Sequence, residues 1–333
     1  MFGTLRLVLA LMVALAHVSV SVGGYHLGVP AVVGFYLLSG YVVASLLAPG
    51  SPMAARPMLF YGERALRLLP LYYFFALMGA LAWQLAGPQP FIGVARPSLA
   101  QWLANLLIVP LNFFMFWPAL EALVFIPPAW SLGLELQFYL LAPWLMRSRT
   151  AMAAAMGGTL AVHCLAAFGV VHTDWFGYRL LCGNLFVFLA GVWLYQARAG
   201  LQPRWPLVAA WAAMLLLAVA SGLAGRWGVP FVLEVQVGFL VALPLVALLA
   251  RLPRRHWDDA AGNLAYGAFL AHFPVMWLAA RAGWLGADHG PLWLYVALVV
   301  LSAAVAHCLV ERPLMAWRHR LRRTQLQGLP ASA

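Results

Sequence analysis

Apolar runs long enough to cross a lipid bilayer recur from one end of this 333-residue chain to the other. A spanning helix needs about 20 mostly apolar residues, because the hydrocarbon core is about 30 Å thick. Only 9% of the residues are charged and 65% are hydrophobic, whereas about a quarter of the residues in a soluble domain are charged. The sequence therefore predicts an all-α, polytopic integral membrane protein. We expect about ten transmembrane helices, at 5–22, 29–48, 70–86, 131–146, 151–171, 179–196, 206–223, 230–250, 262–281 and 291–310.

The formal net charge of +11 comes from arginine, because the sequence contains no lysine. The arginines cluster in alternate connections between the predicted spans, a pattern typical of membrane topology rather than of nucleic-acid binding. By the positive-inside rule these connections are cytoplasmic, which places both termini in the cytoplasm. The clustered positions are Arg56, Arg64, Arg67, Arg147, Arg149, Arg198, Arg204, Arg251, Arg254, Arg255, Arg318, Arg320, Arg322 and Arg323.

Residues 87–128 do not fit a simple count of spans, although they are apolar and rich in aromatic residues. To keep Arg147 and Arg149 cytoplasmic, this segment must begin and end on the outer face, so we expect a re-entrant or interfacial hairpin. One or two ordinary spans with inverted topology downstream are the alternative. We expect a single membrane domain over 1–315 and a short basic and polar cytoplasmic tail over 316–333.

The first apolar run carries an arginine, Arg6, and a histidine, His17, eleven residues apart. In a helix these side chains share one face and are separated by roughly 16 Å of rise, about half the hydrocarbon depth. A snorkelling arginine and a satisfied core histidine are the structural alternative. Cleavage of a secretory signal after Ala14-Leu15-Ala16 is a further alternative, which the apolar sequence up to Val22 disfavours.

Two more stretches place polar side chains within apolar sequence. YGERALRLLPLYY carries Arg64 and Arg67 on one side of a helix start, where the anionic partner is a lipid headgroup or a phosphate-bearing cosubstrate. PPAWSLGLELQFYLLAP places Ser131, Glu135 and Tyr139 on one stripe of a span. Because polar groups inside a membrane are costly, such residues indicate a functional site.

The remaining polar positions lie near the C-terminal end and in the second span. GNLAYGAFLAHFPV contains Tyr266 and His272, and HCLVERP contains Glu311, which we expect to pair with a nearby arginine. The small residues Gly34, Ser39 and Gly40 predict close helix packing. Cys164, Cys182 and Cys308 are isolated from one another, so we expect no metal site.

Six stretches, in order, resemble the membrane-bound acyltransferase 3 family over about residues 5–315. They are the Arg6–His17 pair, FYLLSGY, RALRLLPLYY, WSLGLELQFYLLAP, YGAFLAHFP and VERP. The chain departs from the family pattern at Ala265 and Gly267, where serines usually flank the tyrosine. It also departs in Leu134-Glu135-Leu136, where two adjacent acids are common.

The resemblance implies transfer of an acyl group, expected to be acetyl, from cytoplasmic acyl-CoA to a hydroxyl at the outer face. The acceptor would be a glycan, a glycolipid or another metabolite. The protein would lie in the inner (plasma) membrane of a bacterium, in contact with membrane lipids. Arg6 and His17 would be the donor-binding and catalytic residues, with Arg64 and Arg67 in the donor pocket. The expected supporting residues are Ser131, Glu135, Tyr139, Tyr266 and His272.

The spacing of Arg6 and His17 suits such a donor, which has phosphates at one end and a thioester at the other. His17 would take the proton of the acceptor hydroxyl as a general base or would form an acyl-histidine intermediate. A transporter or flippase is the alternative function, because polar stripes in helices also line permeation paths. A non-catalytic membrane scaffold is a further alternative.

The arginine distribution generates a testable topology. We expect reporter fusions placed after Arg149 and after the C-terminus to report the cytoplasm, as should the connections carrying Arg64, Arg198 and Arg254. A fusion within residues 87–128 should report the outer face and serves as the opposite control. An external signal from either cytoplasmic fusion would contradict the assignment of spans.

Overall fold

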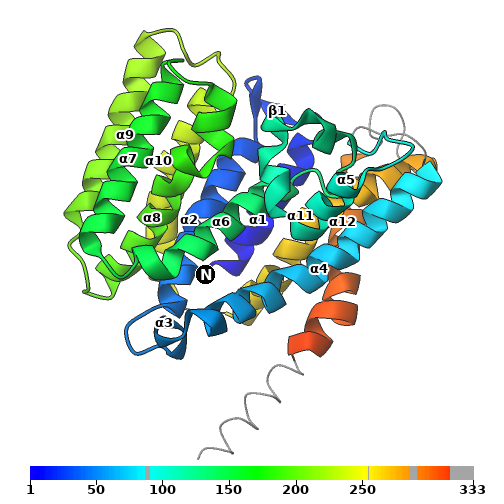
Figure 1. The fold of residues 1–333 in the computed structure, drawn as a ribbon, viewed down its shortest axis with the longest axis horizontal. Helices are drawn as coiled ribbons and strands as arrows, with labels where there is room; N and C mark the ends of the chain where they lie inside the picture. The colour runs from blue at the N-terminus through cyan, green and yellow to red at the C-terminus, as the bar shows by residue number, and fades with distance from the viewer. Residues whose placement is uncertain (87–90, 254, 285–290, 316–333) are drawn as a thin grey trace, which may run out of the picture.

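The computed structural model describes residues 1–86, 91–253, 255–284 and 291–315, and it is almost entirely helical (Figure 1). The predicted tail at 316–333 and Arg254 lie outside the described residues. The elements are α1 (Gly3–Ala16), β1 (Ser21–Val22), β2 (Tyr25–His26), α2 (Gly28–Leu46), α3 (Pro52–Ala55), α4 (Pro57–Ala86), α5 (Leu99–Leu107), η1 (Val109–Phe116), η2 (Pro118–Ala122), α6 (Ala129–Leu145), α7 (Arg149–Ala167), η3 (Trp175–Arg179), α8 (Leu181–Arg198), α9 (Trp205–Leu223), α10 (Val232–Leu249), α11 (His256–Arg281), α12 (Leu292–Ala306) and η4 (His307–Glu311).

Seven helical stretches in the described part of the chain are long and apolar enough to cross a membrane, which confirms an all-α integral membrane protein. They are Gly28–Leu46, Pro57–Leu85, Arg149–Ala167, Trp175–Arg198, Trp205–Leu223, Val232–Leu249 and Leu292–Met315. Each of the ten predicted spans falls on a helix, but three of these helices do not qualify. α1 has 14 residues and α6 has 17, and α11 begins with polar residues.

The predicted span 5–22 is wrong at its C-terminal end, because α1 stops at Ala16. Beyond it, β1 and β2 pair antiparallel as a short hairpin. Gly23 and Gly24 form its turn with φ of 59° and 83°, and positive φ at both central residues matches the right-handed twist of the strands. α4 also differs from the prediction, since it begins at Pro57 and continues through Pro70.

Close packing of α2 on α8 depends on glycine, as the small-residue pattern predicts for Gly40. A Cβ atom on Gly40 would lie 1.9 Å from the carbonyl oxygen of Phe188, and one on Gly191 would lie 2.0 Å from that of Leu37. No side chain fits at these distances, so the two backbones approach as only glycine permits.

Within residues 91–128 the structure contains no helix long enough to cross a membrane, and the segment folds back on itself, while its re-entrant or interfacial position stays a prediction. Ile92 and Leu123 form an antiparallel bridge that brings its ends together. α5 begins with a capping box between Ser98 and Gln101. The Asn105 side chain then joins α5 to the returning chain. Its Nδ2 donates to the carbonyl of Leu123, and its Oδ1 accepts from the backbone N–H of Phe125.

The predicted cytoplasmic connections lie beside one another. The ammonium of Met1 donates to the carbonyl of Leu249 at 3.1 Å, and the Arg149 guanidinium donates to the carbonyl of Leu201 at 3.0 Å. In Figure 1 the N-terminus and α3 lie toward the lower end of the molecule, and β1 lies at the upper end. The orientation of these ends relative to a membrane stays a prediction.

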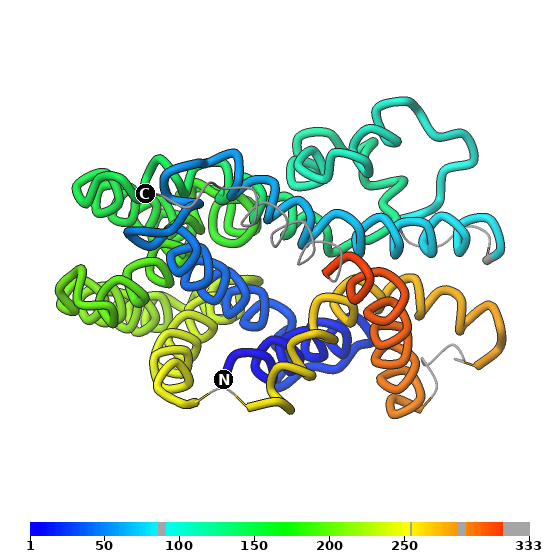
Figure 2. Tube along the Cα trace, turned by 90° about the horizontal axis from the view of Figure 1, so that it is seen from below, coloured from blue at the N-terminus to red at the C-terminus, as the bar shows by residue number. Residues whose placement is uncertain are grey.

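The first turn of α1 is capped by a residue from the far end of the chain. Asp258, in the first turn of α11, accepts from the backbone N–H groups of Gly3 and Thr4 at 3.1 and 2.9 Å and from the Thr4 hydroxyl at 2.9 Å. α1 and α11 consequently run side by side (Figure 2). This cap fixes the start of the helix that carries Arg6 and His17.

We expect Asp258→Ala to lower the free energy of unfolding by about 1–2 kcal/mol, because it leaves the N-terminal amides of α1 without their acceptor. Thermal unfolding of the detergent-solubilised protein measures this change. The control is Asp259→Ala, which changes the exposed neighbouring carboxylate. Equal stability of the two variants would contradict the capping role.

Candidate functional site

Three cavities surround α1. The arginine cavity has a volume of about 230 Å³ and is lined by Arg6, whereas the histidine cavity has a volume of about 570 Å³ and is lined by His17. His17 also lines a side cavity of about 290 Å³. Val32 and Ser131 belong to the walls of both the arginine and the histidine cavities. The first helix therefore presents its two polar side chains to two adjoining cavities.

The arginine cavity brings together all three arginines predicted for the donor. Arg6 comes from α1, and Arg64 and Arg67 come from α4. Within the described residues, the guanidinium groups of Arg6 and Arg64 have no hydrogen-bond acceptor or ion-pair partner, although Arg64 lies 5.9 Å from the Tyr139 ring centroid. Unpaired cations in a partly buried cavity are suited to an anionic ligand.

Arg67 differs from the other two arginines because it is ion-paired with Glu311 at 2.5 Å. Glu311 also contacts Nδ1 of His307 at 2.8 Å. Glu311 is thus paired with an arginine, but the partner comes from α4 and is not near Glu311 in the sequence as expected. The pair joins α4 to the C-terminal end of the helical domain, so Arg67 has less charge free for a ligand than Arg6 or Arg64.

The predicted polar stripe on α6 faces the same cavity. Glu135 accepts hydrogen bonds from the hydroxyls of Ser39 and Tyr139, both at 2.5 Å. Ser131 donates to the carbonyl of Pro128 at 2.8 Å, and Tyr266 donates to the carbonyl of Leu68 at 3.1 Å. The sequence predicts only close packing for Ser39. In the structure, the Ser39 hydroxyl on α2 donates a hydrogen bond to the Glu135 carboxylate on α6.

His17 lies at the C-cap of α1 rather than in the middle of a span, because the helix ends one residue earlier. Its Nδ1 is 2.8 Å from the carbonyl oxygen of Val13. A carbonyl can only accept, so Nδ1 carries the proton and the neutral ring keeps its lone pair on Nε2. The geometry leaves His17 with one nitrogen that can accept a proton.

Aromatic rings from two other segments enclose His17. Its ring centroid lies 5.5 Å from that of His26, 5.1 Å from that of His272 and 4.8 Å from that of Phe273. His272 is fully buried, its Nδ1 donates to the carbonyl of Phe269 at 2.6 Å, and its Nε2 has no partner in the described residues. The structure thus places His272 against His17, whereas Tyr266 belongs to the arginine cavity.

The sequence pattern did not predict Arg179 as a site residue, although it lines both the histidine cavity and the side cavity. Its Nε donates to Asp174 at 2.6 Å, and its guanidinium lies 4.5 Å from the Trp130 ring centroid and 5.1 Å from that of Phe114. Burial lowers the pKa of His26, and the positive charge of Arg179 lowers it further. The only sequence signal for Arg179 is a charge at the first residue of the predicted span 179–196.

The described residues contain no group of three or more histidine, cysteine, aspartate or glutamate side chains that could hold a metal ion. Two further residues of the histidine cavity, His26 and Glu234, were not predicted as site residues. His26 lies against His17 from the β1–β2 hairpin, and Glu234 lines the cavity from the first turn of α10. Neither position is marked by a local sequence pattern.

A family model described as "Acyltransferase domain" matches residues 3–311. Nodulation protein 10 of Rhizobium leguminosarum bv. viciae is 25% identical over 318 residues, which cover 88% of this chain and 83% of that protein. An uncharacterized protein of Aquifex aeolicus (strain VF5) is 29% identical over 194 residues, which cover 56% of this chain and 84% of that protein. No solved structure matches the chain. Because the family model covers nearly the whole chain, the protein belongs to the acyltransferase 3 family and is a membrane acyltransferase.

Proposed function

We propose that the protein transfers an acetyl group from acetyl-CoA, bound through the arginine cavity, to a hydroxyl of an acceptor in the histidine cavity. The acceptor class is a glycan, a glycolipid or another hydroxyl-bearing metabolite. One observation carries this proposal: a single helix presents Arg6 to one cavity and His17 to another, and the cavities share walls.

The charge of the arginine cavity supports an acyl-CoA donor. Three guanidinium groups and one carboxylate line it, and two of the guanidinium groups have no partner within the described residues. Guanidinium groups bind phosphate oxygens in a bidentate manner. Residues of α1, α2, α4, α6 and α11 line the cavity, and a site built between five helices favours a cosubstrate over the lipid headgroup that the sequence left open.

The tautomer of His17 supports general-base catalysis. Nε2 takes the proton of the acceptor hydroxyl as that oxygen attacks the thioester carbonyl carbon. The tetrahedral intermediate then expels the thiolate of coenzyme A, which receives the proton from the His17 imidazolium. The products are the acyl ester and free coenzyme A, and no other reactant is needed.

The proposed location is a bacterial inner membrane, with the arginine cavity reached from the cytoplasm and the acceptor from outside. The arginine asymmetry supports this orientation. Two bacterial relatives, from Rhizobium and Aquifex, agree with a bacterial origin. The surrounding partners are membrane lipids, and no nucleic acid takes part.

We expect His17→Ala to leave the affinity for acetyl-CoA within a few-fold of the wild type while the turnover falls by roughly 10²–10⁴-fold, the range for general acid–base catalysis. Release of coenzyme A from labelled acetyl-CoA by the purified protein measures both quantities. His172→Ala, at an exposed histidine, is the matched control. Normal turnover of His17→Ala would show that His17 is only a core residue.

We expect Arg6→Ala to raise the KM for acetyl-CoA by about ten- to a hundred-fold, because it removes a charge-assisted contact to a phosphate worth about 1.5–3 kcal/mol. Arg6→Lys rescues the KM in part if the cation acts as a point charge, and not at all if a planar fork is needed. The control is Arg56→Ala, at an exposed arginine outside the cavity. An unchanged KM for Arg6→Ala would contradict binding of the donor in the arginine cavity.

A further inference from the structure

The histidine cavity contains a carboxylate for which the proposed chemistry has no use. Glu234 lies in the first turn of α10 and is only 8% exposed. Its Oε2 is buried without a hydrogen-bond partner in the described residues, although the side chain lines the cavity. A buried carboxylate oxygen without a donor is costly, so this position needs a ligand that supplies hydrogen-bond donors.

The charges of the two cavities differ, and this restricts what the histidine cavity can bind. Three arginines and one glutamate line the arginine cavity. In the histidine cavity the permanent charges are those of Arg179 and Glu234, and Arg179 is already ion-paired with Asp174. The histidine cavity therefore has no excess positive charge with which to hold an anionic acceptor.

Part of the remaining wall of the histidine cavity is aromatic. Trp130, Trp227, Tyr178 and Phe231 line it, and the rings of Tyr178 and Phe231 are stacked with centroids 5.0 Å apart and planes 10° apart. A cavity of about 570 Å³ lies within the range of small-molecule sites. Aromatic faces with one hydrogen-bond acceptor suit a ring that has an apolar C–H face and hydroxyl groups at its edge.

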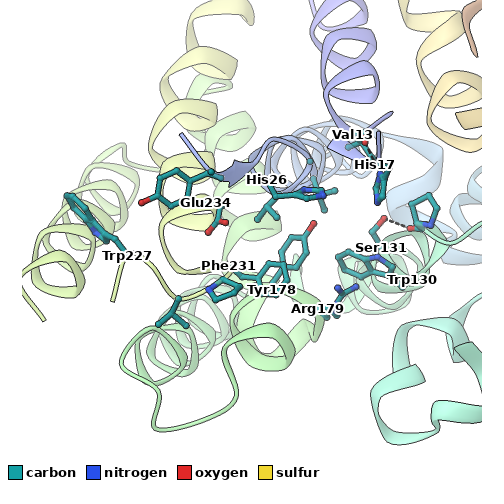
Figure 3. Close-up of a pocket in the computed structure, with 18 of the residues that line it drawn as sticks. Val13, His17, His26, Trp130, Ser131, Tyr178, Arg179, Trp227, Phe231 and Glu234 are labelled. Atoms are coloured by element: carbon teal, nitrogen blue, oxygen red, sulfur yellow. Dashed lines mark hydrogen bonds between the residues drawn. The ribbon is translucent and has the colours of Figure 1, made fainter. Parts of the chain in front are cut away.

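We propose that Glu234 selects the acceptor, with its carboxylate accepting hydrogen bonds from hydroxyl groups of an uncharged sugar ring packed on these aromatic faces. Figure 3 shows Glu234 and His17 toward different sides of the cavity, with His26 between them in this view. A sugar held at Glu234 presents another of its hydroxyls toward Nε2 of His17. This inference rests on the proposed function, because it assigns the acceptor to the histidine cavity.

The test uses the full-length protein in detergent and matched methyl glycosides, with dissociation constants measured by saturation-transfer NMR titration. The probes are methyl glucoside, methyl galactoside, methyl N-acetylglucosaminide and methyl glucuronide. We expect at least one neutral glycoside to bind. If methyl glucoside binds, we expect methyl glucuronide to bind about ten-fold or more weakly than methyl glucoside. Glu234→Gln keeps the side-chain volume and should weaken binding of the neutral glycoside about ten-fold.

Glu121→Gln is the matched control, because Glu121 lines the side cavity and not the histidine cavity. Weaker sugar binding in Glu121→Gln but not in Glu234→Gln would show that the acceptor binds in the side cavity. That result would overturn the proposed role of Glu234. Tighter binding of the glucuronide than of every neutral glycoside, or no binding of any neutral glycoside, would also overturn it.

The affinity for coenzyme A distinguishes the two proposals and shows whether each variant is folded. If the wild-type protein neither binds coenzyme A nor releases it from acetyl-CoA, the proposed function fails. If the donor reactions occur, and Glu234→Gln binds coenzyme A and the neutral glycosides as the wild type does, only the role of Glu234 fails.

Discussion

The capped first helix is the constraint on which the candidate site depends. Asp258 fixes its start through three hydrogen bonds, and its end turns into the β1–β2 hairpin at His17. Between Arg6 and His17 the backbone rises by roughly 16 Å, a spacing that an α-helix holds rigidly. In the proposed function, this fixed spacing separates the cation for the donor phosphates from the base at the thioester.

Some polar side chains inside this membrane protein have hydrogen-bond or ion-pair partners, and others do not. Glu135 is satisfied by two hydroxyls and Glu311 by Arg67, so these groups hold α2, α4 and α6 to the rest of the bundle. Nε of Arg64 and Oε2 of Glu234 are buried without a hydrogen-bond partner in the described residues. Because unpaired polar groups are costly in a protein interior, this division separates structural polar residues from those that suit a ligand.

The two main cavities suit opposite ends of an acyl transfer. The arginine cavity is smaller and has an excess of positive charge, whereas the histidine cavity is larger, aromatic and balanced in charge. Val32 and Ser131 line both cavities, so the proposed transfer takes place beside these residues. The hairpin at 91–128 belongs to the same arrangement, since Phe114 and Val124 line the side cavity on the other face of His17.

The sequence by itself determined the helices and the family, because hydrophobic runs and helical spacing are local properties. It also determined that Arg6, Arg64, Arg67, Glu135 and Tyr139 are polar positions within apolar helices, and all of them line one cavity. Only the tertiary structure decided that His17 ends its helix and that Arg67 pairs with Glu311, 244 positions away. It likewise brought His26, Arg179 and Glu234 to one cavity. These contacts join segments far apart in the chain, and they depend on how whole helices pack, which no local pattern of residues records.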